Sequence, residues 1–248
     1  MAWLFHYPLI FKKTQALLDD LEEKYSQENE LGFFVSCIQG GLDDFEKSLV
    51  CGPMARRGYL LDIGCGAGRE ALAFSRLGYR VKAIDISRAM LDRAQASAQK
   101  EKLSIEFEKM SVTDLRLKKD VFDYALFSSG VYNDIPTKAL RIASLSQVIH
   151  SVRPGGKVFV PVAAVRRRVL SRGFVVDCLR RFLGRLFGEN IGMEPGDVLI
   201  RKISPASDSR IGAFHHFFSS TREIEAELSA CGYPAIFLKT GLWQITRC

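Results

Sequence analysis

Residues 58–70 read GYLLDIGCGAGRE, and this stretch decides the fold of the chain. Its apolar start predicts a buried strand over 59–63, and the three alternating glycines predict a tight turn that opens into a helix. Glycine leaves room for a ligand to approach the backbone, and a helix N-terminus presents free N–H groups to that ligand. The stretch therefore predicts a binding site for a nucleoside-containing cofactor.

The spacing of the glycines separates two classes of cofactor. A dinucleotide fingerprint, Gly-x-Gly-x-x-Gly, needs glycine where this chain has Arg69, so a nicotinamide-dependent dehydrogenase is disfavoured. The order Asp-x-Gly-x-Gly-x-Gly resembles motif I of the class I S-adenosylmethionine-dependent methyltransferases, with Asp62, Gly64, Gly66 and Gly68 on its positions. The resemblance implies S-adenosyl-L-methionine as cofactor and S-adenosyl-L-homocysteine as product.

Strands and helices alternate downstream of this stretch. Apolar patterning predicts strands over 59–63, 80–86, 105–109, 122–127 and 157–162, with helices between them, which indicates a parallel sheet covered on both faces. Two last strands, 235–239 and 242–246, are joined at Thr240-Gly241 and predict an antiparallel hairpin. The resemblance implies a doubly wound, Rossmann-like sheet of seven mostly parallel strands ending in this hairpin.

The chain is expected to form one α/β domain with accessory segments. Residues 58–248 form the predicted methyltransferase domain, and the resemblance implies that the helical segment 1–57 packs over the cofactor cleft as a lid. A basic helical insertion is predicted over about 163–212, followed within it by a strand at 198–203.

The residues that bind the cofactor are predicted from the ends of the strands and from the resemblance. Asp85 ends the second strand, where its carboxylate accepts both ribose hydroxyls. The resemblance implies that Asp114 receives the adenine amine; the alternative is a helix cap. The predicted cofactor set is Asp62, Gly64, Cys65, Gly66, Gly68, Arg69, Asp85, Ile86, Met90, Thr113, Asp114, Leu115, Phe127 and Ser128.

Candidates for catalysis are Tyr132, which follows the fourth strand, and the pair His215 and His216 before the last helix. A histidine can act as a general base near neutral pH, but the pair can equally serve packing and hydrogen bonding, and the sequence does not separate its two members. The six cysteines show no C-x-x-C pair, so no metal site is predicted and the thiols are expected to be reduced.

Composition and charge indicate where in the cell the protein lies and what kinds of partner it binds. Apolar residues make up 47% of the 248 residues and no run of about 18 apolar residues occurs, so we expect a cytoplasmic protein without a transmembrane segment. Segment 165–187 holds seven arginines and one aspartate, which accounts for +6 of the net charge of +7. This segment is interpreted as a surface for RNA or another anionic partner, or as a helical cap with solvated arginines.

Three hypotheses for function remain open at this point. The leading one is methyl transfer to a small-molecule acceptor, because the motif series is accompanied by lid-sized segments and by no nucleic-acid-binding module. An RNA methyltransferase, tRNA above all, is the alternative favoured by the arginines. A non-catalytic sensor or scaffold that binds S-adenosylmethionine is the third. The acceptor atom and the oligomeric state are not predicted.

Overall fold

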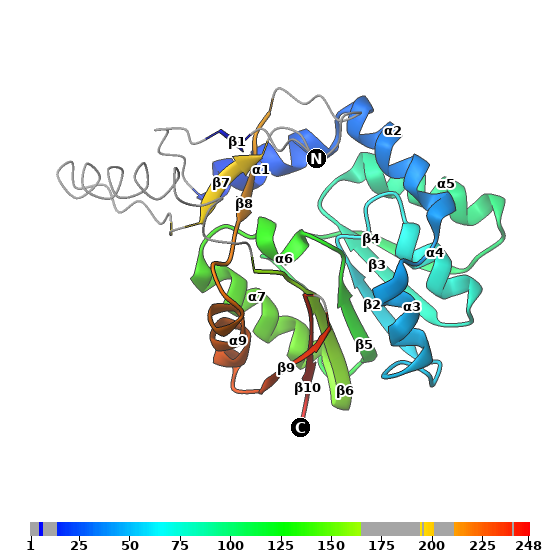
Figure 1. Ribbon diagram of the computed structural model, residues 1–248. Coiled ribbons are helices and arrows are strands. Elements are labelled where there is room, and N and C mark those ends of the chain that lie inside the picture. Colours follow the sequence, from blue (N-terminus) through cyan, green and yellow to red (C-terminus); the bar gives the residue numbers. More distant parts are fainter. Residues whose placement is uncertain (1–4, 7–13, 165–193, 195, 201–210, 240) are drawn as a thin grey trace.

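A computed structural model describes residues 5–6, 14–164, 194, 196–200, 211–239 and 241–248 (Figure 1). The helices are α1 (Thr14–Tyr25), α2 (Glu28–Cys37), η1 (Ile38–Gly40), α3 (Asp44–Cys51), α4 (Arg69–Arg76), α5 (Arg88–Lys100), α6 (Val131–Asp134), α7 (Lys138–Ser151), α9 (Thr221–Leu228) and η2 (Ser229–Cys231). The strands are β1 (Phe5–His6), β2 (Tyr59–Ile63), β3 (Arg80–Asp85), β4 (Ile105–Lys109), β5 (Phe122–Phe127), β6 (Val152–Pro161), β7 (Asp197–Ile200), β8 (Ala213–His216), β9 (Ala235–Lys239) and β10 (Leu242–Thr246).

A seven-stranded sheet forms the centre of the fold, in the order β4-β3-β2-β5-β6-β10-β9 (Figure 1). The first five strands are parallel, and β10 runs antiparallel to both β6 and β9. The chain reverses its direction along the sheet between β4 and β5, so ligands are expected at the carboxyl ends of the strands near β2 and β5. The predicted Rossmann-like sheet with a reversed C-terminal hairpin is confirmed.

Each face of this sheet buries an apolar layer. Alternate residues of a strand point to opposite faces, so β2 sends Leu60 to one layer and Leu61 to the other. The first layer contacts α3, α4 and α5 through Leu49, Phe74 and Leu91. The second layer contacts α7 and α9 through Val148, Ile149, Ile224 and Leu228. Burial on both faces explains why the central strands β2 and β5 are mostly apolar, whereas β4 at the edge alternates apolar and charged residues.

The glycine turn between β2 and α4 is a left-handed backbone path. Gly64, Gly66 and Gly68 have φ angles of 73°, 51° and 93°, a region that side chains with a Cβ rarely adopt. The N–H groups of Gly64 and Cys65 both donate to the carbonyl oxygen of Ile84, at 2.8 and 3.0 Å. The turn is therefore fixed to the end of the neighbouring strand β3.

A second, three-stranded antiparallel sheet, β1-β7-β8, lies against α1 (Figure 1). Leu199 of β7 and Phe214 of β8 pack on Leu17 of α1. The strand predicted at 198–203 corresponds to β7, which begins at Asp197, whereas β8 was not predicted because four residues carry too little periodic signal. This small sheet brings β8 next to α6 and the carboxyl edge of the main sheet.

The structure also corrects the prediction around Pro154. The fifth strand was predicted at 157–162, whereas β6 begins directly after α7, at Val152, and so includes Pro154. The basic segment 165–187 and most of the insertion 163–212 lie outside the described residues. None of the described helices has the length and apolar composition needed to cross a bilayer.

Gly156 tests the packing of β6 against β5. A Cβ at this position would lie 2.3 Å from Val152 Cγ1 and 2.7 Å from the carbonyl oxygen of Asp123, so we expect Gly156→Ala to lower the free energy of unfolding by about 1–3 kcal/mol. Chemical denaturation measures the change. Gly32→Ala is the matched control, because Gly32 lies in α2 with open space around its Cα; it should raise stability by roughly 0.5–1 kcal/mol. Equal effects of the two substitutions would contradict the packing described here.

Candidate active site

A cavity of about 210 Å³ lies at the carboxyl edge of the main sheet. Its floor comes from the ends of β2 and β3 and from the segments that follow β4 and β5, and its cover comes from α1 and α2. The helical cover contributes Leu18, Leu21, Tyr25, Phe34 and Cys37. The cavity therefore joins the predicted cofactor turn to the N-terminal segment.

Asp85 forms a polar corner of the cavity and is held there by two backbone N–H groups. Its Oδ2 accepts a hydrogen bond from the Gly66 N–H and its Oδ1 accepts one from the Ser87 N–H, both at 2.8 Å. Burial raises the pKa of this carboxyl, and the two N–H donors oppose that rise. A carboxylate has about four acceptor sites, so Asp85 keeps capacity for ligand hydroxyls while its orientation is fixed.

A buried acidic pair lies beneath the glycine turn. Asp62 is fully buried; its Oδ1 accepts from the Ser128 hydroxyl at 3.2 Å, and its Oδ2 has no hydrogen-bond partner among the described residues. Burial and the nearby Glu70 carboxylate raise the pKa of Asp62 well above its usual range. Burial likewise raises the pKa of Glu70 to about 7, although Arg69 opposes the rise. An unpartnered buried carboxylate oxygen is complementary to a cationic ligand group.

Arg69 connects this turn to the N-terminal segment. Its guanidinium contacts both carboxylate oxygens of Glu46 at 2.7 and 2.8 Å, the carbonyl oxygen of Gly41 at 2.7 Å and the Glu70 carboxylate at 2.5 Å. Glu46 also closes the capping box of α3 with Asp43. The Nη1 and Nη2 groups of Arg69 are therefore bonded to the protein, and they dock α3 beside the turn.

The region after β4 differs from the prediction for the adenine end. Ser111 and Val112 line the cavity there. The Asp114 side chain is 70% exposed and pairs with Arg116 at 3.0 Å, so it points to solvent. Neither Thr113 nor Leu115 belongs to the cavity lining. Periodicity placed the end of β4 correctly but does not determine which side chain of the following loop turns inward.

Three polar groups meet on the opposite wall. Asp134, which ends α6, lines the cavity; its Oδ1 lies 2.7 Å from His215 Nδ1, and its Oδ2 accepts from the Tyr25 hydroxyl at 3.3 Å. A carboxylate only accepts hydrogen bonds, so His215 Nδ1 carries the proton in this pair. The side chains of His215 and Asp134 remain 16% and 14% exposed. Tyr25 of α1 and Asp134 of α6 line the cavity, whereas His215 of β8 is not among the lining residues and is joined to the wall through Asp134.

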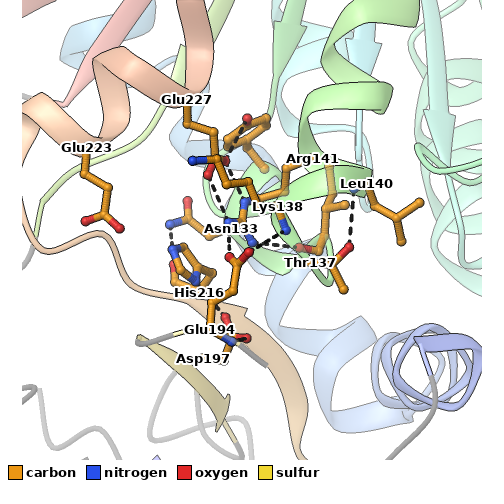
Figure 2. A network of polar contacts seen from close by, with 12 residues as sticks. Asn133, Thr137, Lys138, Leu140, Arg141, Glu194, Asp197, His216, Glu223 and Glu227 are labelled. Carbon is orange, nitrogen blue, oxygen red and sulfur yellow. Dashed lines mark hydrogen bonds and ion pairs between the residues drawn. The ribbon is translucent and has the colours of Figure 1, made fainter. Parts of the chain in front are cut away.

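His216 points to the other side of β8, into a buried polar network (Figure 2). Its Nδ1 lies 2.6 Å from Asp197 Oδ1, and its side chain is only 2% exposed. Its carbonyl oxygen accepts from Asn133 Nδ2 at 2.8 Å. The two histidines that the sequence did not separate therefore occupy different environments, and only His215 is hydrogen-bonded to a cavity residue.

Arg141 is the central cation of that network (Figure 2). Its fully buried guanidinium contacts Glu227 at 2.7 and 3.0 Å and Glu194 at 2.8 Å. The Tyr132 hydroxyl donates to Glu227 at 3.1 Å, and burial raises its pKa well above the usual range. Tyr132 is fully buried and lies outside the cavity lining, so the structure gives it a packing position.

Some of the residues predicted to bind the cofactor line the cavity, and others do not. The predicted residues that line it are Gly64, Cys65, Gly66, Arg69, Asp85, Ile86, Met90 and Ser128. Those outside its lining are Asp62, Gly68, Thr113, Asp114, Leu115 and Phe127. Lining residues that the sequence analysis missed include Tyr25, Phe34 and Asp134. Phe34 and Tyr25 belong to apolar stretches of the predicted lid, which was the available signal.

These features define an α/β protein with a glycine-turn site for a nucleoside-type ligand. Residues 60–156 match the family model described as a methyltransferase domain. The chain is 35% identical over 101 residues to a ubiquinone biosynthesis O-methyltransferase of Nitrosococcus oceani, covering 40% of this chain and 41% of the relative. Its identity to the Methylocella silvestris protein of the same name is 32% over 126 residues, covering 50% and 46%. The chain thus spans less than half the length of these two relatives.

Solved structures share the whole fold. A SAM-dependent methyltransferase from Methanosarcina mazei superposes with a TM-score of 0.60 at 21% identity, covering 83% of this chain and 96% of that one. The Burkholderia thailandensis 1,6-didemethyltoxoflavin-N1-methyltransferase superposes with a TM-score of 0.59 at 16% identity, covering 96% and 92%. The domain match and these superpositions therefore show a methyltransferase domain over residues 60–156 and the Rossmann-like fold of S-adenosylmethionine-dependent methyltransferases.

The raised pKa of Glu70 makes stability depend on pH. The folded state holds the proton of the Glu70 carboxyl more tightly than the unfolded state does. The contribution of this proton to the free energy of unfolding is therefore fully present below about pH 4.5 and is lost as the pH rises through about 7. Glu70→Gln removes that loss. We expect its free energy of unfolding, relative to the unchanged protein, to rise by roughly 3 kcal/mol between about pH 4.5 and pH 8. Urea unfolding at both pH values measures this; exposed Glu225→Gln is the control, and a parallel pH dependence of Glu70→Gln and the unchanged protein would refute the assignment.

Arg141 tests the buried network. Arg141→Met leaves the buried Glu227 carboxylate without its cation, so we expect a loss of about 3–5 kcal/mol in the free energy of unfolding. Arg93→Met, which breaks an exposed pair with Glu28, should cost less than about 1 kcal/mol. Thermal and urea unfolding compare the two, and the double substitution Arg141→Met with Glu227→Met should recover part of the loss. Similar small costs for both arginines would show that the network contributes little.

Proposed function

We propose that this chain transfers a methyl group from S-adenosylmethionine to a small-molecule acceptor. The observation that carries the proposal is the covered cavity in which the glycine turn, the fixed Asp85 carboxylate and the acceptor-side wall of Asp134 meet. Domain match and fold support it, and so do the names of the relatives, which are O-methyltransferases.

The residues present fit the cofactor at both of its polar ends. Asp85 would accept the ribose hydroxyls, with Ile86 and Met90 against the adenine ring. The unpartnered oxygen of Asp62 would balance the ammonium of the methionine part, and the turn at Gly64 and Gly66 leaves its backbone open to close approach. When bound, the cofactor supplies an electrophilic methyl group on a sulfonium.

The N-terminal segment would serve as the lid, as expected from the sequence. It is attached to the domain by Arg69 with Glu46, by the Ser26 and Ser87 hydroxyls 3.1 Å apart, and by Lys109 with Glu22 at 2.5 Å. Excluding water and holding the acceptor in line with the methyl group are worth roughly 7–11 kcal/mol in favourable cases. A cavity of this size under two helices favours a small acceptor.

An RNA acceptor remains the alternative proposal, and it rests on the arginines of 165–187, which lie outside the described residues. It predicts an affinity for tRNA that falls steeply with salt. A sensor or scaffold would bind the cofactor with no turnover of any acceptor.

Calorimetric titration with S-adenosylmethionine and S-adenosylhomocysteine tests the cofactor site. We expect micromolar binding, and a 10- to 100-fold weaker affinity in Asp85→Ala, because the lost hydrogen bonds to a charged acceptor are worth about 1.5–3 kcal/mol. Asp114→Ala is the matched control, since that carboxylate points to solvent, and it should bind as the unchanged protein does. Circular dichroism confirms that both variants fold. Absence of binding by the folded, unchanged protein would reject the proposed function.

A further inference from the structure

The strand β9, at one end of the main sheet, is apolar and exposed (Figure 1). Five large apolar side chains are exposed among the described residues. Three of them are consecutive in β9: Ile236, Phe237 and Leu238, with exposed fractions of 52%, 48% and 39%. Successive residues of a strand point to opposite faces, so Ile236 and Phe237 present apolar surface on both faces of the sheet. An end strand of this kind is a template for pairing with another chain.

The opposite end of the sheet is protected by charge. There β4 reads IEFEK, and its Glu106 and Glu108 form ion pairs with two basic residues of β3, at 2.6 and 2.5 Å. Charged side chains on an end strand oppose pairing with another chain. In β9, residues 235–238 contain no charge, and Lys239 at the end of the strand is its one charged residue. A sheet with one end suited to pairing forms a closed pair of copies and not an open filament.

The backbone of β9 has groups available for such pairing. The N–H of Arg247, directly after β10, donates to a carbonyl oxygen of β6. Because the backbone groups of a strand alternate in direction, those of Gln244 point to β9, where Ile236 is its partner. The N–H and C=O groups of Ala235 and Phe237 therefore point away from β10. The register between the two strands shifts only beyond Phe237, so 235–237 is a regular stretch.

A second copy of the chain fits this edge. In an antiparallel pair about a twofold axis at Ile236, Ala235 of each copy lies opposite Phe237 of the other, and these residues exchange their outward hydrogen bonds. Ile236 then faces Ile236 of the other copy. Lys239 falls opposite Tyr233, so like charges do not meet across the pair. The edge is therefore complementary to itself in hydrogen bonding, shape and charge.

The surface available is that of a weak dimer. Half-exposed side chains of this size contribute on the order of 100 Å² each, so three from each copy supply roughly 600 Å². The backbone edges bring the buried area to roughly 1,000 Å² in total, which is the lower end of a specific interface. The net charge of +7 on each copy opposes association at long range, and salt screens that repulsion.

We propose that β9 is a dimerisation strand. It pairs antiparallel with β9 of a second copy about a twofold axis at Ile236, and the two main sheets become one continuous sheet. This inference does not depend on the reaction proposed above, because it uses no residue of the cavity.

The test is sedimentation velocity of the full chain between about 1 and about 200 µM, a range that brackets a weak association. Reducing agent is present because the chain has six cysteines. Ile236→Lys and Ile236→Glu are measured singly and as an equimolar mixture. Leu77→Lys is the matched control, since Leu77 is a 40% exposed apolar residue at the end of α4. Circular dichroism establishes that each variant folds, and hydrogen exchange of β9 is followed at both ends of the concentration range.

We expect the unchanged protein to form a reversible dimer with a dissociation constant of about 10–100 µM that tightens as salt is raised. Each Ile236 variant alone should associate about 100-fold more weakly or less, because like charges face each other across the axis. The mixture should recover association to within about tenfold of the unchanged protein, since Lys then faces Glu. Leu77→Lys should dimerise as the unchanged protein does, and the amides of 235–237 should exchange more slowly at high concentration.

The other outcomes count against the proposal. A monomer over the whole concentration range would overturn it. A dimer that persists in both folded Ile236 variants would place the contact on another surface and would overturn it as well. Growth of the unchanged protein into species larger than a dimer would overturn the twofold closure. Failure of the mixture to associate would overturn the register that sets Ile236 opposite its own copy.

Discussion

The left-handed turn at Gly64, Gly66 and Gly68 is the constraint on which the rest of the site depends. It exists because the first two N–H groups of the turn donate to one carbonyl oxygen of β3 and the third donates to the Asp85 carboxylate. A single strand end therefore shapes the turn and supplies the acidic residue beside it. A 2.8 Å hydrogen bond joins the turn to Asp85, so the two keep a fixed relative position in the cavity lining.

The site also depends on α6, a helix of four residues directly after β5. Val131 packs so closely on the turn that a Cβ on Gly64 would lie 2.3 Å from its Cγ2. The next three side chains each hold a different part of the protein: Tyr132 bonds α9, Asn133 bonds the backbone of β8, and Asp134 bonds His215. One helical turn thus joins the glycine turn to α9 and β8, and the side chain of His216 on β8 is held by Asp197 in the buried network (Figure 2).

Features with a local cause were the ones that could be predicted. The strand 59–63, the glycine turn and Asp85 follow from apolar runs and glycine spacing, and the alternation of strands with helices fixed the sheet. Asp114 lies outside the cavity lining, which the sequence did not show because a loop after a strand has no period that says which side chain turns inward. Tyr25 was missed because its role comes from contact with a residue 109 positions away. Had residues 213–216 been recognised as a strand, the period of two would have separated His215 from His216.

The order of these residues along the chain has a consequence for synthesis on the ribosome. The turn, Asp85 and Met90 all precede Asp134 and His215 in the chain, so the elements of the nucleoside side can begin to pair early in translation. Asp134 and His215 are 81 residues apart, and Tyr25 precedes Asp134 by 109. The hydrogen bond between Asp134 and His215 therefore cannot form until β8 has left the exit tunnel, a delay on the order of ten seconds at ordinary elongation rates. The glycine turn and Asp85 are thus made well before β8, and the contacts of β8 with β7, α1 and α6 are completed last.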